Sequence, residues 1–291
     1  MQRIKIGLSL PTAYLSGDYV RGGETWYKMF GTLADCLGVL RKAGVSSIEV
    51  NDLHMEPPIT QIEPAVENIL KYGFHLTVHI FLPDLDKQNV FPDSLQKTFR
   101  ILKDKNQDSP LILHGHNFDD YSSREEAVYK TITDLTGLVK RFRDNKMMNP
   151  VALELCRHRK GGPVGVTYQE IQDMVDAVKE DNIGICWDMG HTLSNINSQA
   201  WDNPFPAEAF LDRVIHTHIH ALDKNQKTHG PLGKKDDLVN SFLILLKTHK
   251  YQGIYNFELY PERWGESFVL RKELVLQSIK TLQEILTRQG D

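Results

Sequence analysis

Acidic and histidine side chains stand at or near the ends of several short apolar runs along the chain. In chain order they are His79, His114, His116, Glu154, Asp188, His191, His216, His218, His220 and Glu258. A carboxylate inside an apolar run costs free energy unless it is paired or coordinated. Carboxylate and imidazole groups that converge on one place bind divalent metal ions. These residue types therefore predict a metal centre.

The runs that carry these residues have the character of buried strands. Each is short, rich in Ile, Val or Leu, and bounded by Gly, Pro, Asn or Asp. The predicted strands cover residues 4–10, 47–50, 75–81, 110–114, 151–155, 183–188, 214–220 and 254–259. Amphipathic segments between them predict helices at residues 25–42, 62–72, 93–103, 124–143, 167–180, 206–213, 236–248 and 267–288. Thr167 and Glu170 have the spacing of a capping box at the start of one helix.

Eight strand–helix units of about 36 residues each predict a (β/α)8 TIM barrel. A doubly wound open sheet is the alternative, but such sheets usually have fewer units and a glycine-rich first turn. The sequence contains neither a G-x-G-x-x-G nor a G-x-x-x-x-G-K-[ST] motif. No linker or shift in composition divides the chain, so we expect one domain over residues 1–291. In a barrel, the carboxyl ends of all strands meet at one mouth, where the acidic and histidine residues would gather.

Composition and charge exclude several classes of protein. Of 291 residues, 41% are apolar and 25% are charged, which is enough for a sizeable core. Lys and Arg total 34 against 38 Asp and Glu, and the net charge of −4 argues against a nucleic-acid-coating surface. Three scattered cysteines without a C-x-x-C argue against a disulfide framework or a cysteine zinc site. No signal peptide or membrane-length apolar run is present, so we expect a soluble cytoplasmic protein that binds neither membrane nor nucleic acid.

Four motifs resemble the xylose isomerase-like TIM barrel superfamily, in particular its sugar isomerase and epimerase group, which includes endonuclease IV. They are Ala-Leu-Glu-Leu at 152–155, Cys-Trp-Asp-Met-Gly-His at 186–191, His-Thr-His-Ile-His-Ala-Leu-Asp at 216–223 and Phe-Glu-Leu at 257–259. They stand in the family order on the fifth to eighth predicted strands, and His-Gly-Pro-Leu-Gly follows the third motif at 229–233. The eight-unit layout extends the resemblance to the whole chain.

The resemblance implies a ligand set of one histidine and three carboxylates: Glu154, Asp188, His218 and Glu258. His216 and His220 alternate onto the same strand face as His218. The sequence therefore does not decide which of these three histidines binds the metal. One nitrogen and three carboxylates suit Mn²⁺ or Mg²⁺, with Zn²⁺ and Co²⁺ also compatible.

The resemblance also implies roles at the substrate. In ketose 3-epimerases of this group, the two glutamates move the proton, which makes Glu154 and Glu258 the expected catalytic pair. The residues expected at the substrate are His79, His114, His191, Lys224 and His229. Lys224 stands where those epimerases carry a substrate-binding arginine.

The expected function is a divalent-metal-dependent isomerase or epimerase of a sugar, sugar phosphate or cyclitol. A metal ion that chelates a carbonyl and an adjacent hydroxyl acidifies the C–H between them by stabilising the enediolate. One carboxylate then removes the proton and the other returns it from the opposite face. The expected partner is a small sugar or polyol. The outer face of the helix predicted at residues 267–288 could also form the contact of a homo-oligomer.

Several alternatives stay open. Both glutamates could be ligands only, with a histidine as the base, or the enzyme could be a dehydratase or lyase of the same superfamily. An endonuclease IV-like DNA repair enzyme with three zinc ions is another alternative, because His79, His114, His191 and His229 match metal-binding positions there. Against it, Thr228 precedes His229 where that family has an aspartate, and the chain is acidic. A non-catalytic binding barrel is the last alternative. Gly233, Lys234 and Lys235 form a candidate phosphate-binding loop.

Overall fold

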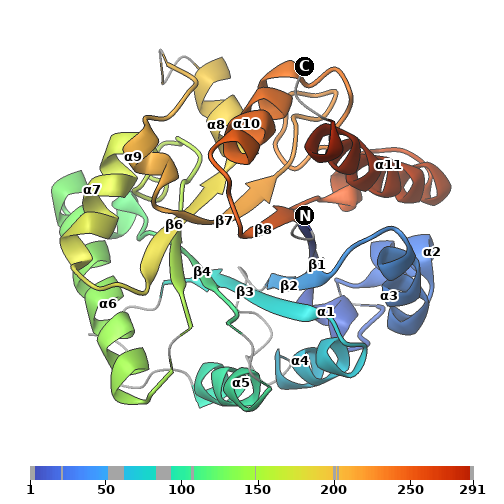
Figure 1. Ribbon diagram of the computed structural model, residues 1–291, viewed down its shortest axis with the longest axis horizontal. Helices are drawn as coiled ribbons and strands as arrows, with labels where there is room; N and C mark the ends of the chain where they lie inside the picture. Colours follow the sequence, from blue (N-terminus) through green and yellow to red (C-terminus); the bar gives the residue numbers. More distant parts are fainter. Residues whose placement is uncertain are drawn as a thin grey trace.

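The computed structural model describes residues 4–20, 22–51, 62–82, 93–105, 108–147, 149–198, 201 and 203–288. Eight parallel strands pair in chain order and close into a barrel (Figure 1). The strands are β1 Lys5–Pro11, β2 Ser47–Asn51, β3 His75–Phe81, β4 Leu111–His114, β5 Val151–Glu154, β6 Ile183–Asp188, β7 Val214–Ile219 and β8 Ile254–Phe257. This architecture confirms the predicted (β/α)8 TIM barrel.

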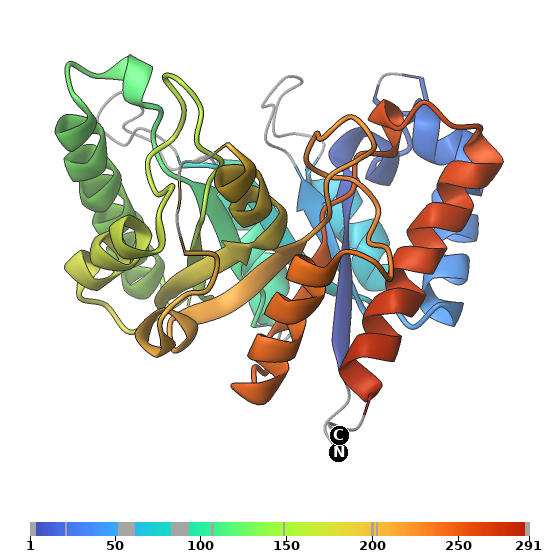
Figure 2. The same cartoon turned by 90° about the horizontal axis from the view of Figure 1, so that it is seen from above.

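The helices surround the barrel on its outside (Figures 1 and 2). They are α1 Thr12–Leu15, α2 Glu24–Phe30, α3 Leu33–Lys42, α4 Ile62–Lys71, α5 Asp93–Asp104, α6 Arg124–Asp144, α7 Tyr168–Val178, α8 Met189–Asn197, α9 Glu208–Leu211, α10 Asp237–Thr248 and α11 Phe268–Thr287. None of these described helices is long and apolar enough to span a bilayer.

The strand predictions agree with the structure to within two residues at each end, whereas two helix predictions need correction. The helix expected over residues 25–42 is two helices, because Gly31 has a φ of 82° and ends α2. Thr32 then starts α3 through a reciprocal capping box with Asp35. At Thr167, the hydroxyl caps the Glu170 amide as predicted, but the Glu170 carboxylate accepts from residues 165 and 166 instead.

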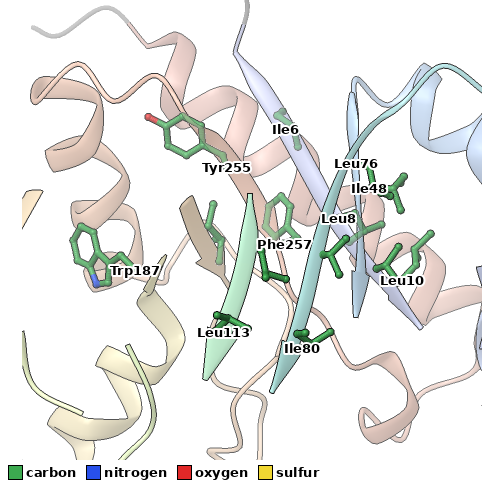
Figure 3. Close-up of a cluster of buried hydrophobic side chains, with 14 of the residues drawn as sticks. Ile6, Leu8, Leu10, Ile48, Leu76, Ile80, Leu113, Trp187, Tyr255 and Phe257 are labelled. Atoms are coloured by element: carbon green, nitrogen blue, oxygen red, sulfur yellow. The ribbon is translucent and has the colours of Figure 1, made fainter. Parts of the chain in front are cut away.

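Alternation along the strands separates an apolar outer layer from a polar barrel interior. Ile48 and Leu76 belong to the hydrophobic core, which also includes the other side chains labelled in Figure 3. The next residue on each strand, Glu49 and Thr77, points to the opposite side. These two residues are register neighbours on β2 and β3, and both are fully buried. The strands thereby place polar side chains inside the ring.

Candidate functional site

The structure brings the four expected metal ligands together at the carboxyl end of the barrel. Glu154 and Asp188 are the last residues of β5 and β6, His218 lies on β7, and Glu258 directly follows β8. All four are buried, and one potential ligand atom from each lies within 4.8 Å of those of the other three. Parallel strands of similar length end at the same mouth, which is why residues far apart in sequence meet here.

Glu154 lies at the centre of this cluster. Its carboxylate oxygens are 2.9 Å from His79 Nε2, 3.2 Å from His114 Nε2, 3.2 Å from His191 Nδ1 and 3.1 Å from His218 Nδ1. Burial alone would raise the pKa of Glu154, but the adjacent His114, His79 and His218 outweigh it and hold the pKa well below its usual range. The carboxylate is therefore ionised at neutral pH.

The side-chain atoms of this cluster lie close together, but many of them do not have the geometry of a hydrogen bond. Several buried atoms have no hydrogen-bond partner: both ring nitrogens of His79 and His114, both oxygens of Glu154, His218 Nδ1 and Glu258 Oε2. An unsatisfied buried polar group costs about 1–3 kcal/mol. A divalent cation would accept lone pairs from such a mixture of carboxylate oxygens and imidazole nitrogens. The residues present therefore fit a metal ion.

Glu49 on β2 is a buried acidic residue that the sequence analysis did not select. It accepts hydrogen bonds from Ser9 Oγ at 2.6 Å and Thr77 Oγ1 at 3.2 Å. It also lies 3.0 Å from Nε2 of both His216 and His218 on the far side of the barrel. The run Ser-Ile-Glu-Val-Asn carries the same signal that selected Glu154, an acid between apolar strand residues.

Glu49 sets which nitrogen of His218 faces the ligand cluster. Burial alone would raise the pKa of Glu49, but His218 and His216 outweigh it and hold the pKa below its usual range. An ionised carboxylate only accepts hydrogen bonds, so His218 Nε2 must donate to it. When the ring is neutral, as a metal-binding imidazole must be, the lone pair is therefore on Nδ1, which lies 3.1 Å from Glu154 and 3.4 Å from Glu258. Such a carboxylate–histidine contact orients a metal-binding imidazole.

The other histidines selected from the sequence have different surroundings. His216 contacts Glu49 beneath the cluster. His220 Nε2 is 3.1 Å from Asp188, and its Nδ1 accepts from the His229 backbone at 2.9 Å. His116 Nε2 pairs with the buried Asp134 at 2.7 Å, away from the four-ligand cluster.

Other groups of potential ligands adjoin the four-ligand cluster, and two of them include residues that the sequence selected for the substrate. One comprises His79, His114 and Glu154, and the other comprises His191, His220 and His229. Each group has its potential ligand atoms within 4.8 Å of one another, and the first shares Glu154 with the central cluster. The arrangement therefore offers donor atoms for more than one ion.

His191 owes its position to α8, a helix that the sequence analysis did not predict. Asp188 ends β6 and is also the N-cap of α8, where its Oδ1 accepts from the His191 backbone at 2.5 Å. This cap turns the His191 ring toward Glu154 and Asp188, at 3.2 and 3.4 Å. Burial alone would lower the pKa of His191, but Asp188 and Glu154 raise it to about 9.

A cavity of about 260 Å³ opens above the cluster. Its lining includes His114, His191, His229 and Glu258. His229 stacks on Tyr260 with ring centroids 4.0 Å apart, and burial together with His220 lowers the His229 pKa to about 4. Three of the expected substrate residues thus line the cavity.

The remaining expected substrate residues lie elsewhere. His79 is fully buried beside Glu154. The Lys224 side chain is 65% exposed, pairs with Glu266 at 2.5 Å and does not line the cavity. Lys234, from the candidate phosphate-binding loop, pairs with Glu284 of α11 at 2.8 Å.

The cavity has residues on its rim that the sequence analysis passed over. They are Arg157, Arg159 and Arg263. Only their position on the loops after the fifth and eighth predicted strands could have suggested them from the sequence.

Comparison with known proteins agrees with this architecture. A probable endonuclease 4 from Mesomycoplasma hyopneumoniae is 28% identical over 133 residues, which are 44% of this chain and 43% of that protein. The chain matches less than half the length of its first curated relatives.

Two solved structures cover nearly the whole chain. D-psicose 3-epimerase from Clostridium cellulolyticum H10, in complex with D-tagatose, superposes with a TM-score of 0.61 at 14% identity, covering 96% of this chain and 99% of that one. A 3-keto-D-glucoside 4-epimerase from E. coli gives a TM-score of 0.58 at 12% identity, covering 97% and 99%. These likenesses support the fold. The family model described as xylose isomerase-like TIM barrel matches residues 37–285, and the chain belongs to this family.

Proposed function

We propose that the protein is a divalent-metal-dependent isomerase or epimerase of a small sugar or related polyol. The observation that carries the proposal is the buried cluster of Glu154, Asp188, His218 and Glu258, with unpartnered carboxylate oxygens directly below a small cavity. Glu154 and Glu258 come from β5 and β8, which are not neighbours in the barrel. The two carboxylates therefore approach the centre from different sides. The two epimerase structures support the same reaction class.

The four clustered residues would hold the ion, with Mn²⁺ or Mg²⁺ as the expected metal and Zn²⁺ or Co²⁺ as alternatives. When bound, the ion would polarise the carbonyl and neighbouring hydroxyl of the sugar and acidify the C–H between them. Asn51 Nδ2 and Tyr260 Oη donate to Glu258 Oε1 at 2.7 and 3.1 Å, which fixes this carboxylate and leaves Oε2 free. Glu258 Oε2 and a Glu154 oxygen would each hold or return the substrate proton.

His191 and His114 would bind the sugar from the cavity wall. Both rings line the cavity, and His191 is held by its contacts with Glu154 and Asp188. In the metal-free protein, burial alone would lower the pKa of His191, but Asp188 and Glu154 raise the pKa to about 9.

Conservative variants of the two glutamates test the reaction. Glu154→Gln and Glu258→Gln keep a coordinating oxygen but remove the basicity, so turnover should fall by about 10²–10⁴-fold. Glu273→Gln, on the exposed face of α11, is the matched control. Proton exchange at the substrate C–H is followed by NMR in deuterated water on a panel of sugars. Exchange without product in one variant would support two opposite faces, whereas near-wild-type turnover in both would place the base elsewhere.

A metal-dependent phosphodiesterase is the second candidate, because further groups of potential ligands adjoin the central cluster. The curated relative named probable endonuclease 4 points the same way. Metal content by mass spectrometry and cleavage of DNA with an abasic site separate the candidates. Up to three equivalents of zinc together with cleavage would favour the phosphodiesterase, whereas one equivalent and C–H exchange would favour the isomerase.

A further inference from the structure

Three arginines stand on the rim of the cavity. Arg157 and Arg159 lie on the loop between β5 and α7, and Arg263 ends the short helix η3 (Pro261–Arg263) after β8. We call these three residues the arginine rim. Within the described residues, none of them forms an ion pair with a carboxylate, whereas arginines on the outer helices do. Those pairs are Arg124 with Glu170 and Arg143 with Glu180, and Arg213, just before β7, pairs with Asp176 in the same way.

The rim gathers positive charge at a partly buried place. Arg157 is half-buried, and burial together with the positive charges of Arg159 and Arg263 lowers its pKa from the ordinary value. Like charges held close together repel one another, and a bound anion would offset this repulsion. The chain as a whole has a net charge of −4, so the rim is a local feature and not part of a generally basic surface.

The backbone around the rim is held in place. The His158 amide donates to Asn195 Oδ1 at 2.7 Å, and the Gly162 amide donates to the Arg159 carbonyl at 3.1 Å. The Gly162 carbonyl accepts from the Phe118 amide at 2.9 Å. A fixed loop loses less entropy when its side chains bind a ligand.

Arg263 is linked to the ligand cluster by a stack of rings. Its guanidinium lies 4.7 Å from the centre of the Tyr260 ring. Tyr260 stacks on His229, and His229 stacks on His220 with centroids 4.3 Å apart. The stack runs from the donor atoms at the cavity floor to the positive charge at its rim.

We propose that the arginine rim binds the phosphate group of a phosphorylated sugar whose reacting carbons lie over Glu154 and Glu258. Guanidinium groups bind phosphate oxygens in a bidentate fashion, and several of them can balance a dianion. A cavity of about 260 Å³ holds one small sugar and not a duplex, which favours a phosphate monoester. The inference rests on the proposed function for the position of the reacting carbons, but not for the phosphate contact.

Equilibrium binding to the metal-loaded protein tests the rim separately from catalysis. The probes are inorganic phosphate, fructose 6-phosphate and fructose, each titrated calorimetrically. Arg157→Gln should weaken binding of both phosphate probes by about tenfold to a hundredfold, the range for a hydrogen bond to a charged group. Binding of fructose should not change. Arg100→Gln, an exposed arginine of α5, is the matched control and should bind all probes as the wild type does.

The outcomes distinguish the two proposals. If Arg157→Gln, Arg159→Gln and Arg263→Gln all bind inorganic phosphate like the wild type, the phosphate sits elsewhere and the rim proposal is wrong, whatever the enzyme catalyses. If the three substitutions weaken phosphate binding but no sugar exchanges its C–H proton, the rim stands and the isomerase proposal fails. If abasic DNA binds through the rim and fructose 6-phosphate and inorganic phosphate do not, the rim serves a nucleic acid and the monoester proposal is overturned.

Discussion

Two polar layers lie one above the other inside the barrel, and their hydrogen bonding differs. The deeper layer surrounds Glu49. Its two carboxylate oxygens accept hydrogen bonds from the side chains of Ser9, Thr77, His216 and His218. Asn256 donates to Ser9 Oγ at 2.9 Å and extends this layer. The layer at the mouth surrounds Glu154, and neither of its oxygens has a hydrogen-bond partner. Both layers contain a buried carboxylate among histidines, but only the Glu49 carboxylate has hydrogen-bond partners at both oxygens, and in this sense we call its layer complete, although His216 Nδ1 and Asn256 Oδ1 have no partner.

The difference shows which buried polar groups serve the fold and which serve a ligand. A buried carboxylate is stable when its own neighbours donate to it, as at Glu49. At Glu154, the neighbours approach closely without donating, which leaves lone pairs for a cation. His218 belongs to both layers: Nε2 binds Glu49 and Nδ1 faces Glu154. The complete layer therefore orients the ring that the open layer needs.

Breaking the complete layer should have the largest effect. Glu49→Leu removes the acceptor of two histidines and should lower the free energy of unfolding by about 3–5 kcal/mol, as for the loss of one partner of a buried pair. Metal affinity should fall by about tenfold to a hundredfold, because His218 loses its orientation. Urea denaturation and chelator competition measure the two effects.

Glu49→Gln keeps one acceptor oxygen, so it should fall between the wild type and Glu49→Leu on both measurements. Ser9→Ala removes one donor to Glu49 and the acceptor of the Asn256 amide, and it is the control, with an expected loss of about 1–3 kcal/mol and no change in metal affinity. ¹⁵N NMR of the imidazoles adds a direct measure of the His218 tautomer. An unchanged tautomer and unchanged metal affinity in Glu49→Leu would show that the two layers are independent.

Removing metal should affect only the open layer and should have a smaller effect. A ligand at one hundred times its dissociation constant stabilises the native state by about 2.7 kcal/mol. Dialysis against a chelator should therefore lower the melting temperature by several degrees, and added Mn²⁺ should restore it. Asp188→Asn should bind metal more weakly, and excess Mn²⁺ should partly rescue it. If chelation leaves the melting temperature of the wild type unchanged, the Glu154 layer is complete without a metal.

The sequence predicted the barrel and the mouth layer for the same reason. Apolar strand runs and the acidic residues at their ends are visible in the local sequence pattern. The register of a parallel barrel then brings these strand ends together at one mouth. Glu154, Asp188 and Glu258 could be found because each stands at or near the end of an apolar run and within a motif that resembles the family. Glu49 carries the same signal, but it lies in mid-strand, and only the pairing with His216 and His218 across the barrel shows its partners.

Features that depend on loops were beyond the sequence pattern. The helix α8 begins at Met189, directly after its N-cap Asp188. Because Asp188 also ends a strand, the short amphipathic pattern that follows it did not indicate a helix. The arginine rim joins the loops after β5 and β8, and no local spacing links Arg157 with Arg263. Lys224 was selected by its place relative to a motif, and its pairing with Glu266 was not visible in the sequence.

We expect the smallest effect at Lys224, because its side chain already has a partner within the protein. Its ammonium already has a partner in Glu266, and an exposed ion pair of this kind contributes about 0–1 kcal/mol. Lys224→Ala should therefore change stability little and should leave sugar and phosphate binding within about twofold of the wild type, measured by the same calorimetric titrations. Glu266→Gln breaks the same pair from its other side and is the matched variant. A loss of affinity as large as that in Arg157→Gln would show that Lys224 leaves Glu266 to bind substrate. In that case, an ion-pair partner within the protein would not be enough to identify a side chain at this mouth as structural rather than ligand-binding.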